Sequence, residues 1–370
     1  MKKMLKYLSP FAPDQSGVCG VLYELGGLIV ICDAGGCTGN ICGFDEPRWF
    51  TKKSAVFSAG LRDMDAIMGR DDKLIEKLSK AQESLNGSFT ALVATPVPAV
   101  IGTDMKALKR MAEKKTGVPC ISINAIGTKY YDEGESQAWF ELFNEFTEKA
   151  DDSVDGSDYK NMVGILGATP LETGYSSSDV LTEFCRSYGI EESVIFGIGS
   201  GLEAIKNAGM LKKNLVVSAA GIKAAKYLEE HFSVPYEVGY PFIPESVINE
   251  VSAIVEKKEQ IDKILIIHSQ FAANELRNRI RSLSSDPEIK IDIATFFMFD
   301  DDYSEEGDVR LTGEDDLWDI AESGKYDLII ADTDIKRLLD AAKYDGKYIA
   351  FPQFSISGVP LDSGKTLYQY

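Results

Sequence analysis

The sequence predicts an α/β fold in which mostly parallel β-sheets are flanked by helices. The first observation is a series of short, β-branched apolar runs that do not alternate with polar residues. Such runs are typical of strands buried on both faces of a parallel sheet. The second observation is that amphipathic helical segments lie between these runs. Alternation of strand and helix along the chain indicates right-handed crossover connections.

The strand-like runs and the helical segments follow one another in a regular order. The predicted strands lie at residues 25–35, 89–98, 118–124, 161–167, 192–199, 213–221, 234–240, 262–270, 289–297, 326–333 and 346–354. The clearest predicted helices lie at residues 71–85, 104–117, 178–189, 222–232 and 273–285.

A chain of 370 residues is long enough for two or three domains. The acidic stretch 148–161, which contains Gly and Ser and lacks apolar periodicity, is interpreted as a linker. The charged stretch 256–263 precedes a new strand and marks a second junction. We therefore expect three Rossmann-like domains, which comprise residues 1–160, 161–258 and 259–370.

The amino-acid composition argues against several classes of function. The chain has 58 acidic and 39 basic residues and a formal net charge of −19, whereas a nucleic-acid binder needs a basic stripe. The N-terminus lacks the apolar core of a signal peptide, and no run of about 18 apolar residues exists. We expect a cytoplasmic protein without nucleic-acid or membrane partners. In that compartment its six cysteines imply thiols, metal ligands or redox centres.

Three cysteines lie close together after the first apolar run: Cys32, Cys37 and Cys42. Cys19 precedes them at the start of a helical pattern, about one helix, a turn and a strand before Cys37. Such an element folds back on itself, so the thiols of Cys19 and Cys37 could meet. Cysteine thiolates hold iron–sulfur clusters, and a Gly-rich loop lets the backbone approach sulfide. The alternative is that these cysteines are small apolar fillers of the core.

Several longer segments carry a family resemblance. They are "VFSAGLRDMDAIMGRDDKL" (56–74), "VATPVPAVIGTDM" (93–105), residues 163–218, and the third-domain segments 263–283 and 326–354. Together with the cysteine order, they resemble nitrogenase component 1 and its relatives, which include the dark-operative protochlorophyllide reductase catalytic subunits. The resemblance extends over nearly the whole chain and implies a nitrogenase component 1-like fold.

The resemblance implies a cluster at a subunit interface, held in the family by three cysteines per subunit. Cys19 and Cys37 match the first two, and Thr95, before Pro96, stands where the family has the third. Gly35, Gly36 and Gly39 would shape the cluster loop. Two copies of Cys19 and Cys37 would supply the four thiolates of a [4Fe–4S] cluster, or Cys42 or Cys32 would supply a third ligand within one chain.

The implied function is that of an iron–sulfur oxidoreductase subunit, in a homodimer or paired with a homologous subunit. Its electrons would come from an ATP-dependent reductase like the nitrogenase iron protein. The alternative is a non-catalytic metallocofactor carrier or assembly scaffold, and a metal-free binding protein of the same fold is a third possibility. The second-domain segments "GIGSGLEAI" (197–205) and "VVSAAGIKA" (216–224), where the family anchors a catalytic cofactor, contain no cysteine, and the histidine expected near the C-terminus is absent. Binding of an iron–molybdenum cofactor in the known way is therefore not expected.

Other candidates carry weaker signals. Cys120 and Cys185 occupy apolar positions and are expected in the core. His268 ends a predicted strand, where α/β sheets place ligands, whereas His231 lies at a helix end. The segment "GIGSG" (197–201) follows a strand and opens a helix, but a single Gly-x-Gly pattern is weak support for phosphate binding.

Overall fold

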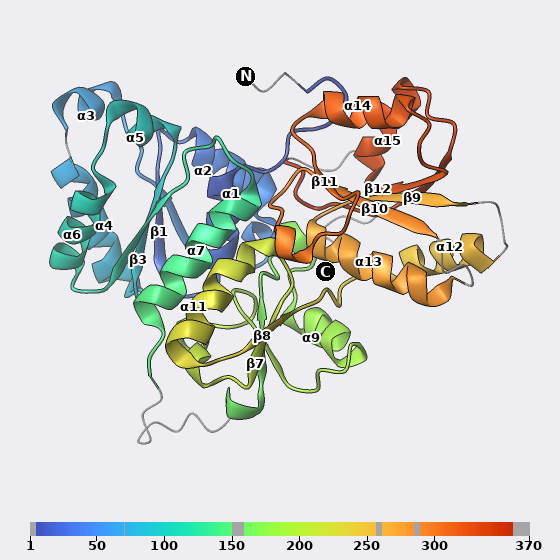
Figure 1. Cartoon of the computed structure of the whole chain (residues 1–370). Helices are drawn as coiled ribbons and strands as arrows, with labels where there is room; N and C mark the ends of the chain where they lie inside the picture. The colour runs from blue at the N-terminus through green and yellow to red at the C-terminus, as the bar shows by residue number, and fades with distance from the viewer. Residues whose placement is uncertain (1–4, 70, 150–158, 257–260, 285–288, 358–370) are drawn as a thin grey trace.

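The computed structural model describes residues 5–69, 71–149, 159–256, 261–284 and 289–357. These residues form three β-sheets, and the strands paired within each sheet are parallel. Helices lie on the sheet faces, and the three sheets follow one another in the colour order of the chain (Figure 1). The α/β class with parallel sheets is therefore confirmed.

The first sheet has the strand order β2-β1-β3-β4. Its strands are β1 (Leu28–Cys32), β2 (Ala55–Ser58), β3 (Thr90–Ala94) and β4 (Cys120–Asn124). Its helices are α1 (Asp14–Leu22), α2 (Gly36–Asn40), α3 (Asp63–Met68), α4 (Asp71–Leu85), α5 (Pro96–Ile101), α6 (Met105–Thr116) and α7 (Tyr131–Phe146).

Alternate residues of β1 face different helices, as the geometry of a strand requires. Leu28 and Val30 pack in one apolar cluster with residues of α4 and α6. Ile29 and Ile31 pack in another cluster with residues of α1 and α7. Since both faces are covered, β1 is buried at every position, which explains its uninterrupted apolar sequence.

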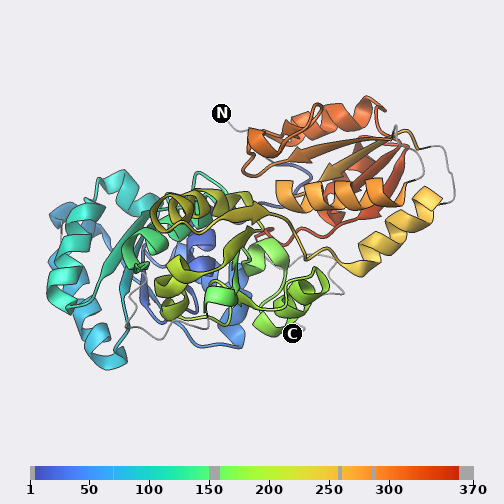
Figure 2. The same ribbon diagram turned by 60° about the horizontal axis from the view of Figure 1, so that its bottom comes forward.

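The second sheet has the order β6-β5-β7-β8, and the third has the order β11-β10-β9-β12-β13. The second comprises β5 (Val163–Leu166), β6 (Ser193–Ile195), β7 (Lys213–Val216) and β8 (Tyr236–Val238), with α8 (Pro170–Thr173), α9 (Ser178–Ser187), α10 (Leu202–Lys206) and α11 (Ile222–Phe232). The third comprises β9 (Lys263–Ile267), β10 (Lys290–Thr295), β11 (Val309–Arg310), β12 (Leu328–Ala331) and β13 (Lys347–Ala350), with α12 (Glu245–Glu256), α13 (Gln270–Leu283), α14 (Glu314–Glu322) and α15 (Thr333–Ala341). Figure 2 shows helices on both faces of the third sheet.

Each strand-like run of the sequence contains a strand, and two strands were not expected. One is β2, a four-residue edge strand that is only partly buried. The other is β11, whose two residues are exposed. Neither has the long apolar run that identifies the buried strands. Edge strands are short and less apolar, so an apolar pattern alone does not reveal them.

Each sheet lies within one of the three predicted domain ranges. Residues 150–158 and 257–260, where the predicted linkers mostly fall, lie outside the described residues, so the boundaries at 160 and 258 stay predictions. The N-terminal segment contacts the third unit instead of the first sheet. Glu314 on α14 accepts backbone hydrogen bonds from Lys6 and Tyr7, each at 2.8 Å, and the blue segment runs beside α14 in Figure 1.

Among the described residues, no helix is both long and apolar enough to cross a membrane.

Candidate functional site

The cysteine stretch lies at the carboxyl end of the first sheet, an edge where α/β folds place ligands. Cys32 ends β1, and the chain turns into α2 at Gly36. Asp33 holds this turn, because its carboxylate accepts hydrogen bonds from the Thr38 backbone N–H at 2.8 Å and from the Ser58 hydroxyl at 2.6 Å. Asp33 was not predicted as a site residue, although an acidic residue directly after a buried strand is a recognisable signal.

The glycines of this loop border open space. A Cβ atom added to Gly35, Gly36 or Gly39 would meet no other atom within 4 Å, and all three residues are exposed. Gly35 has φ of +114°, a conformation that side chains disfavour. The turn therefore requires glycine at position 35, whereas packing within the chain does not require glycine at positions 36 and 39. The backbone of α2 is left open to a group or chain outside this molecule.

Cys37 and Thr95 lie beside one another. Thr95 precedes α5 and is fully buried, and its hydroxyl donates to the Cys32 carbonyl at 2.8 Å. Burial raises the pKa of the partly exposed Cys37 thiol, the Asp33 charge raises it further, and a side-chain hydrogen bond with Thr95 lowers it. Thr95, which stands where the family has its third cysteine, thus contacts the Cys37 thiol that the sequence predicts as a ligand. Pro96 is the first residue of α5.

Cys19 and Cys42 form a second, more buried pair. Cys19 on α1 is fully buried and Cys42 is 8% exposed, and both belong to one apolar cluster. Burial raises the pKa of Cys19 well above its usual value, Glu46 and Cys42 raise it further, and Arg48 lowers it. Burial likewise raises the pKa of Cys42, to about 11. Both residues are therefore protonated thiols at neutral pH.

The described residues of one chain do not complete a metal site. Among them, no three His, Cys, Asp or Glu side chains lie close enough together to hold a metal ion. A [4Fe–4S] cluster needs four ligands, so the residues of one chain do not fit a cluster held within it. The loop glycines are exposed and Cys37 is half-buried, so this part of the site is open to a second chain, whereas Cys19 is fully buried. Ligation by Cys19, Cys37 or Cys42 stays a prediction.

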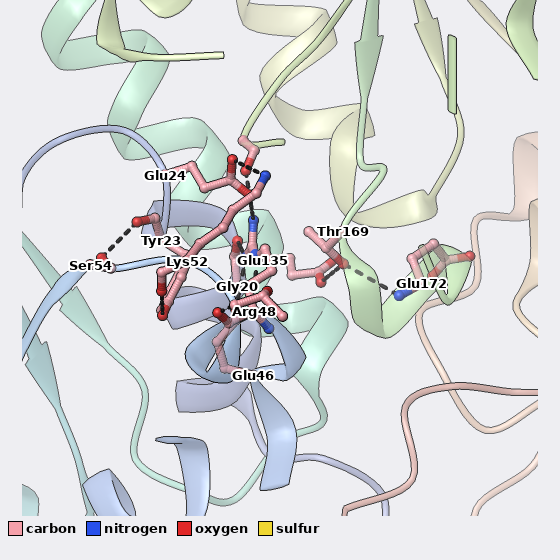
Figure 3. Close-up of polar contacts among 12 residues, drawn as sticks. Gly20, Tyr23, Glu24, Glu46, Arg48, Lys52, Ser54, Glu135, Thr169 and Glu172 are labelled. Carbon is pink, nitrogen blue, oxygen red and sulfur yellow. Dashed lines mark hydrogen bonds and ion pairs between the residues drawn. The ribbon is translucent and has the colours of Figure 1, made fainter. Parts of the chain in front are cut away.

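Arg48 is a buried centre of polar contacts that the sequence analysis missed (Figure 3). Its side chain is fully buried, and it donates to both carboxylate oxygens of Glu46 at 2.7 Å and to Glu24 at 3.0 Å. It also donates to the carbonyls of Gly20 at 2.6 Å and Gly197 at 2.8 Å. The two carboxylates keep Arg48 charged against the effect of its burial. The site therefore contains a fixed cation, which partly offsets the rise in the pKa of Cys19 that burial, Glu46 and Cys42 cause.

The "GIGSG" loop binds a carboxylate of the chain itself. The Gly199 N–H donates to Glu24 at 3.0 Å, and Gly197 and Gly199 both have positive φ. A Cβ atom on Gly197 would lie 3.0 Å from Trp139 and 3.1 Å from the Val21 carbonyl. The glycines thus let this loop of the second sheet pack against α1 and α7. This packing accounts for the loop without a phosphate.

The remaining candidates lie away from this loop or in the core. Cys120 and Cys185 are fully buried, as expected, and Cys32 is buried almost completely. His268 follows β9 in the third sheet and is buried, with Nε2 2.9 Å from the Pro352 carbonyl. His231 is exposed and stacks on Tyr227.

The chain is similar in sequence to proteins of a known family. Residues 26–276 match the model of the family described as nitrogenase component 1 type oxidoreductase. The chain is 26% identical over 187 residues to the nitrogenase iron-molybdenum cofactor biosynthesis protein NifE of Clostridium pasteurianum, a match that covers 49% of this chain and 38% of the relative. It is 26% identical over 190 residues to NifE of Nostoc sp. strain PCC 7120, with 49% and 37% covered. The match thus spans less than two-fifths of each relative.

Solved structures share the fold at low sequence identity. The structure titled Nitrogenase Cp1 at pH 6.5 has a TM-score of 0.70 and 13% identity, and the match covers 100% of this chain and 90% of that one. Nitrogenase Cp1 at pH 5 has a TM-score of 0.68 and 14% identity, with 97% and 86% covered. These likenesses establish the arrangement of the three sheets. With the match over residues 26–276, they show that this chain belongs to the nitrogenase component 1 type oxidoreductase family.

Proposed function

We propose that the protein is an iron–sulfur electron-transfer subunit of a reductase, with a [4Fe–4S] cluster shared between two chains. The observation that carries the proposal is the outward face of α2. There Cys37 presents a partly exposed thiol, and Gly36 and Gly39 leave the backbone uncovered. Two copies of Cys19 and Cys37 supply the four thiolates that such a cluster requires.

The surroundings of the cysteine stretch support a second chain at this face. Phe44 and Phe50, which follow α2 closely in sequence, are 48% and 65% exposed. Large exposed apolar side chains are common where another protein binds. The partner is either an identical chain or a homologous subunit.

Residues of this chain would set the properties of the cluster. When bound, a [4Fe–4S] cluster supplies one-electron transfer. Burial, Glu46 and Cys42 raise the pKa of Cys19, and the buried Arg48 cation partly offsets them, so binding of iron by Cys19 would have to displace its proton. Asp33 holds the loop that carries Cys37. Family membership suggests that the electrons come from an ATP-dependent reductase like the nitrogenase iron protein, and the substrate is not identified.

The second candidate function is a carrier or assembly scaffold for a metallocofactor. The names of the two NifE relatives, which are cofactor biosynthesis proteins, favour this function. The two functions differ in the fate of the metal. A scaffold transfers its cluster to an acceptor protein, whereas an electron-transfer subunit keeps its cluster through repeated reduction and oxidation.

The test is anaerobic purification and reconstitution, followed by iron and sulfide counts and by EPR after dithionite reduction. One [4Fe–4S] cluster per two chains corresponds to about two iron atoms per chain. Cys37→Ala should lose this iron, and Cys185→Ala, which removes a buried thiol of α9, should retain it. Absence of iron after reconstitution, or equal iron in both variants, would contradict the proposal. Loss of the cluster to an apo-acceptor on mixing would favour the scaffold.

A further inference from the structure

Three parts of the fold meet at the buried carboxyl group of Glu172. This residue lies on α8, after β5 of the second sheet, and is fully buried. The hydroxyl of Tyr131, the first residue of α7, is 2.5 Å from Oε2. The hydroxyl of Ser269, after β9 of the third sheet, is 2.5 Å from Oε1. One carboxyl group therefore joins residues that pack with all three sheets.

The contacts continue from Ser269 to His268. His268 Nδ1 is 3.1 Å from the Ser269 hydroxyl, and Nε2 is 2.9 Å from the Pro352 carbonyl. The His268 ring also stacks on Phe351 with the ring centroids 4.0 Å apart. A continuous line of hydrogen bonds thus runs from Tyr131 through Glu172, Ser269 and His268 to the segment after β13.

The hydrogen bonds along this line require one proton more than an ionised Glu172, a neutral His268 and the two hydroxyl groups supply. A carbonyl only accepts, so Nε2 of His268 must carry hydrogen, and Nδ1 of a neutral imidazole then accepts. Ser269 has a single hydroxyl proton and cannot donate to both Nδ1 and an ionised Glu172. All contacts are satisfied only when a further proton sits on Glu172 or on Nδ1. Burial raises the pKa of Glu172 to about 7 and lowers that of His268 to about 4, so the proton sits on Glu172.

Burial and the nearby Asp132 make the ionisation of Glu172 unfavourable, and the hydrogen bonds from Ser269, Tyr131 and Ser218 only partly offset this effect. Asp132 and Glu135 on α7 are both buried, and burial raises the pKa of each. Thr169 links Glu135 to the backbone of α8 (Figure 3). The other titratable groups of this cluster are Tyr131, Tyr240 and His268. Arg48 lowers the pKa of Glu135. Glu133 raises the pKa of Asp132, and Arg310 lowers it. A charge on Glu172 would face two carboxyl groups at close range.

We propose that the line Glu172–Ser269–His268 is a proton-dependent latch between the second and third sheets. With the extra proton in place, every contact between Glu172 and the third sheet is made. When the proton leaves, Ser269 can donate only to Glu172 or to His268, and the buried Glu172 becomes charged. The Ser269–Glu172 bond that joins the sheets can persist, so the cost of the closed arrangement comes from the unpaired Nδ1 of His268 and from the buried charge on Glu172, since each of these costs free energy.

Release of the latch would act on a groove between the two sheets. The groove has a volume of about 740 Å³ and is lined by residues of α9, α12 and α13 and by the segment after β8. Tyr240 lines this groove, and its hydroxyl donates to the Glu172 carbonyl at 3.2 Å. Since α9 belongs to the second sheet and α13 to the third, a local movement of one helix relative to the other widens the groove and breaks the 3.0 Å hydrogen bond from the Tyr188 hydroxyl to Glu275 that crosses it. The latch thus links the protonation of a buried carboxyl group to access at this groove.

Hydrogen–deuterium exchange of the full-length protein tests the latch. Exchange of α9 and α13, corrected for intrinsic rates, should accelerate at least several-fold between about pH 5 and about pH 9, with its midpoint near the pKa of Glu172. In Glu172→Gln the amide N–H₂ donates to Ser269 and the carbonyl accepts from Tyr131, so both helices should stay protected throughout. Glu183→Gln removes an exposed carboxylate of the groove wall and should behave like the wild type.

Two further measurements keep the test decisive. In the infrared spectrum, Glu172→Gln should lose the component of the protonated-carboxyl band that titrates with Glu172, while the components from Asp132 and Glu135 remain. Ser269→Ala breaks the line without changing the carboxyl group, and α9 and α13 should then exchange rapidly at every pH. The latch is excluded by wild-type exchange that does not change with pH. A pH-dependent acceleration that persists in Glu172→Gln or in Ser269→Ala excludes it equally.

Discussion

Arg48 and Glu46 form a two-pronged ion pair in the interior of the protein. Nε and Nη2 of Arg48 lie 2.7 Å from Oε1 and Oε2 of Glu46, and neither side chain is more than 3% exposed. Such planar pairing fixes both position and orientation, which a lysine could not do. Because Arg48 also holds the carbonyls of Gly20 and Gly197, it connects the Cys19 helix to the second sheet.

Removal of the Arg48 charge should strongly destabilise the fold. Arg48→Met leaves Glu46 and Glu24 without their buried cation, which costs about 3–5 kcal/mol when one partner of a buried pair is lost. Urea denaturation of the metal-free protein, followed by tryptophan fluorescence, measures this effect. The control is Arg310→Met, whose ion pair with Glu133 is partly exposed and should contribute less than about 1 kcal/mol. Similar losses in both variants would contradict the central role of Arg48.

Two glycines of α1 offer a matched test of the contact between α1 and α7. A Cβ atom on Gly17 would lie 1.9 Å from the Tyr131 carbonyl, whereas one on Gly20 would meet nothing within 4 Å. Gly17→Ala must therefore push α1 away from α7, and overpacking of this kind costs about 1–3 kcal/mol or more. Gly20→Ala should be neutral or stabilising by up to about 1 kcal/mol, because alanine favours helix.

Thermal unfolding of both glycine variants separates the two effects. Lower stability of Gly17→Ala alone supports the close approach of α7. Since Cys19 lies between the two glycines in the same helix, the pair also tests the placement of that thiol. Equal stability of the two variants would mean that α1 does not approach α7 as described.

Restoring a cysteine at position 95 should strengthen iron binding. Thr95 contacts Cys37, so Thr95→Cys places a third candidate thiolate at that position in each chain. If the proposed cluster exists, reconstituted Thr95→Cys should hold more iron than the about two atoms per chain expected for the wild type, and its EPR signal should differ from that of the wild type. Thr95→Ser keeps the hydroxyl and should match the wild type. Iron counts that are the same in all three proteins would argue against a cluster at this position.

The sequence predicted those parts of the fold that depend on local pattern. The buried strands β1 and β9 have continuous apolar runs, which are visible without a structure. The outward position of Cys37 and the buried position of Cys19 could not be separated by spacing, because both cysteines lie in Gly-containing helical segments. Exposure depends on what packs against each helix, and that is decided by the whole fold.

Arg48 and Glu172 show a different limit of sequence reasoning. Each is a single charged residue in a short segment, and such residues are usually exposed. Their roles arise because groups from distant segments converge on them: Gly197 on Arg48, and Tyr131 and Ser269 on Glu172. No local periodicity encodes a convergence of this kind. The alternation of strands and helices predicts only that loops meet at the carboxyl ends of the sheets.

His268 should lower the stability of the protein on the acidic side. Burial lowers its pKa from 6.5 to about 4, so the unfolded chain binds a proton at this residue between those values and the folded chain does not. Its contribution to the free energy of unfolding is therefore complete above about pH 6.5 and is lost as the pH falls toward 4. The limiting slope for one such group is about 1.4 kcal/mol per pH unit.

The carboxyl groups beside His268 act with the opposite sign. Burial raises the pKa of Asp132 to about 6 and that of Glu172 to about 7, so their contributions are present at low pH and are lost as the pH rises toward those values. His268→Gln should therefore reduce the loss of stability between pH 6.5 and about 4, and Glu172→Gln should reduce the loss between pH 4.5 and about 7. The matched control is His231→Gln, which replaces an exposed histidine instead of a buried one. Urea midpoints measured across this range distinguish the two effects, because over the overlapping pH range the two variants must change the slope of the stability profile in opposite directions.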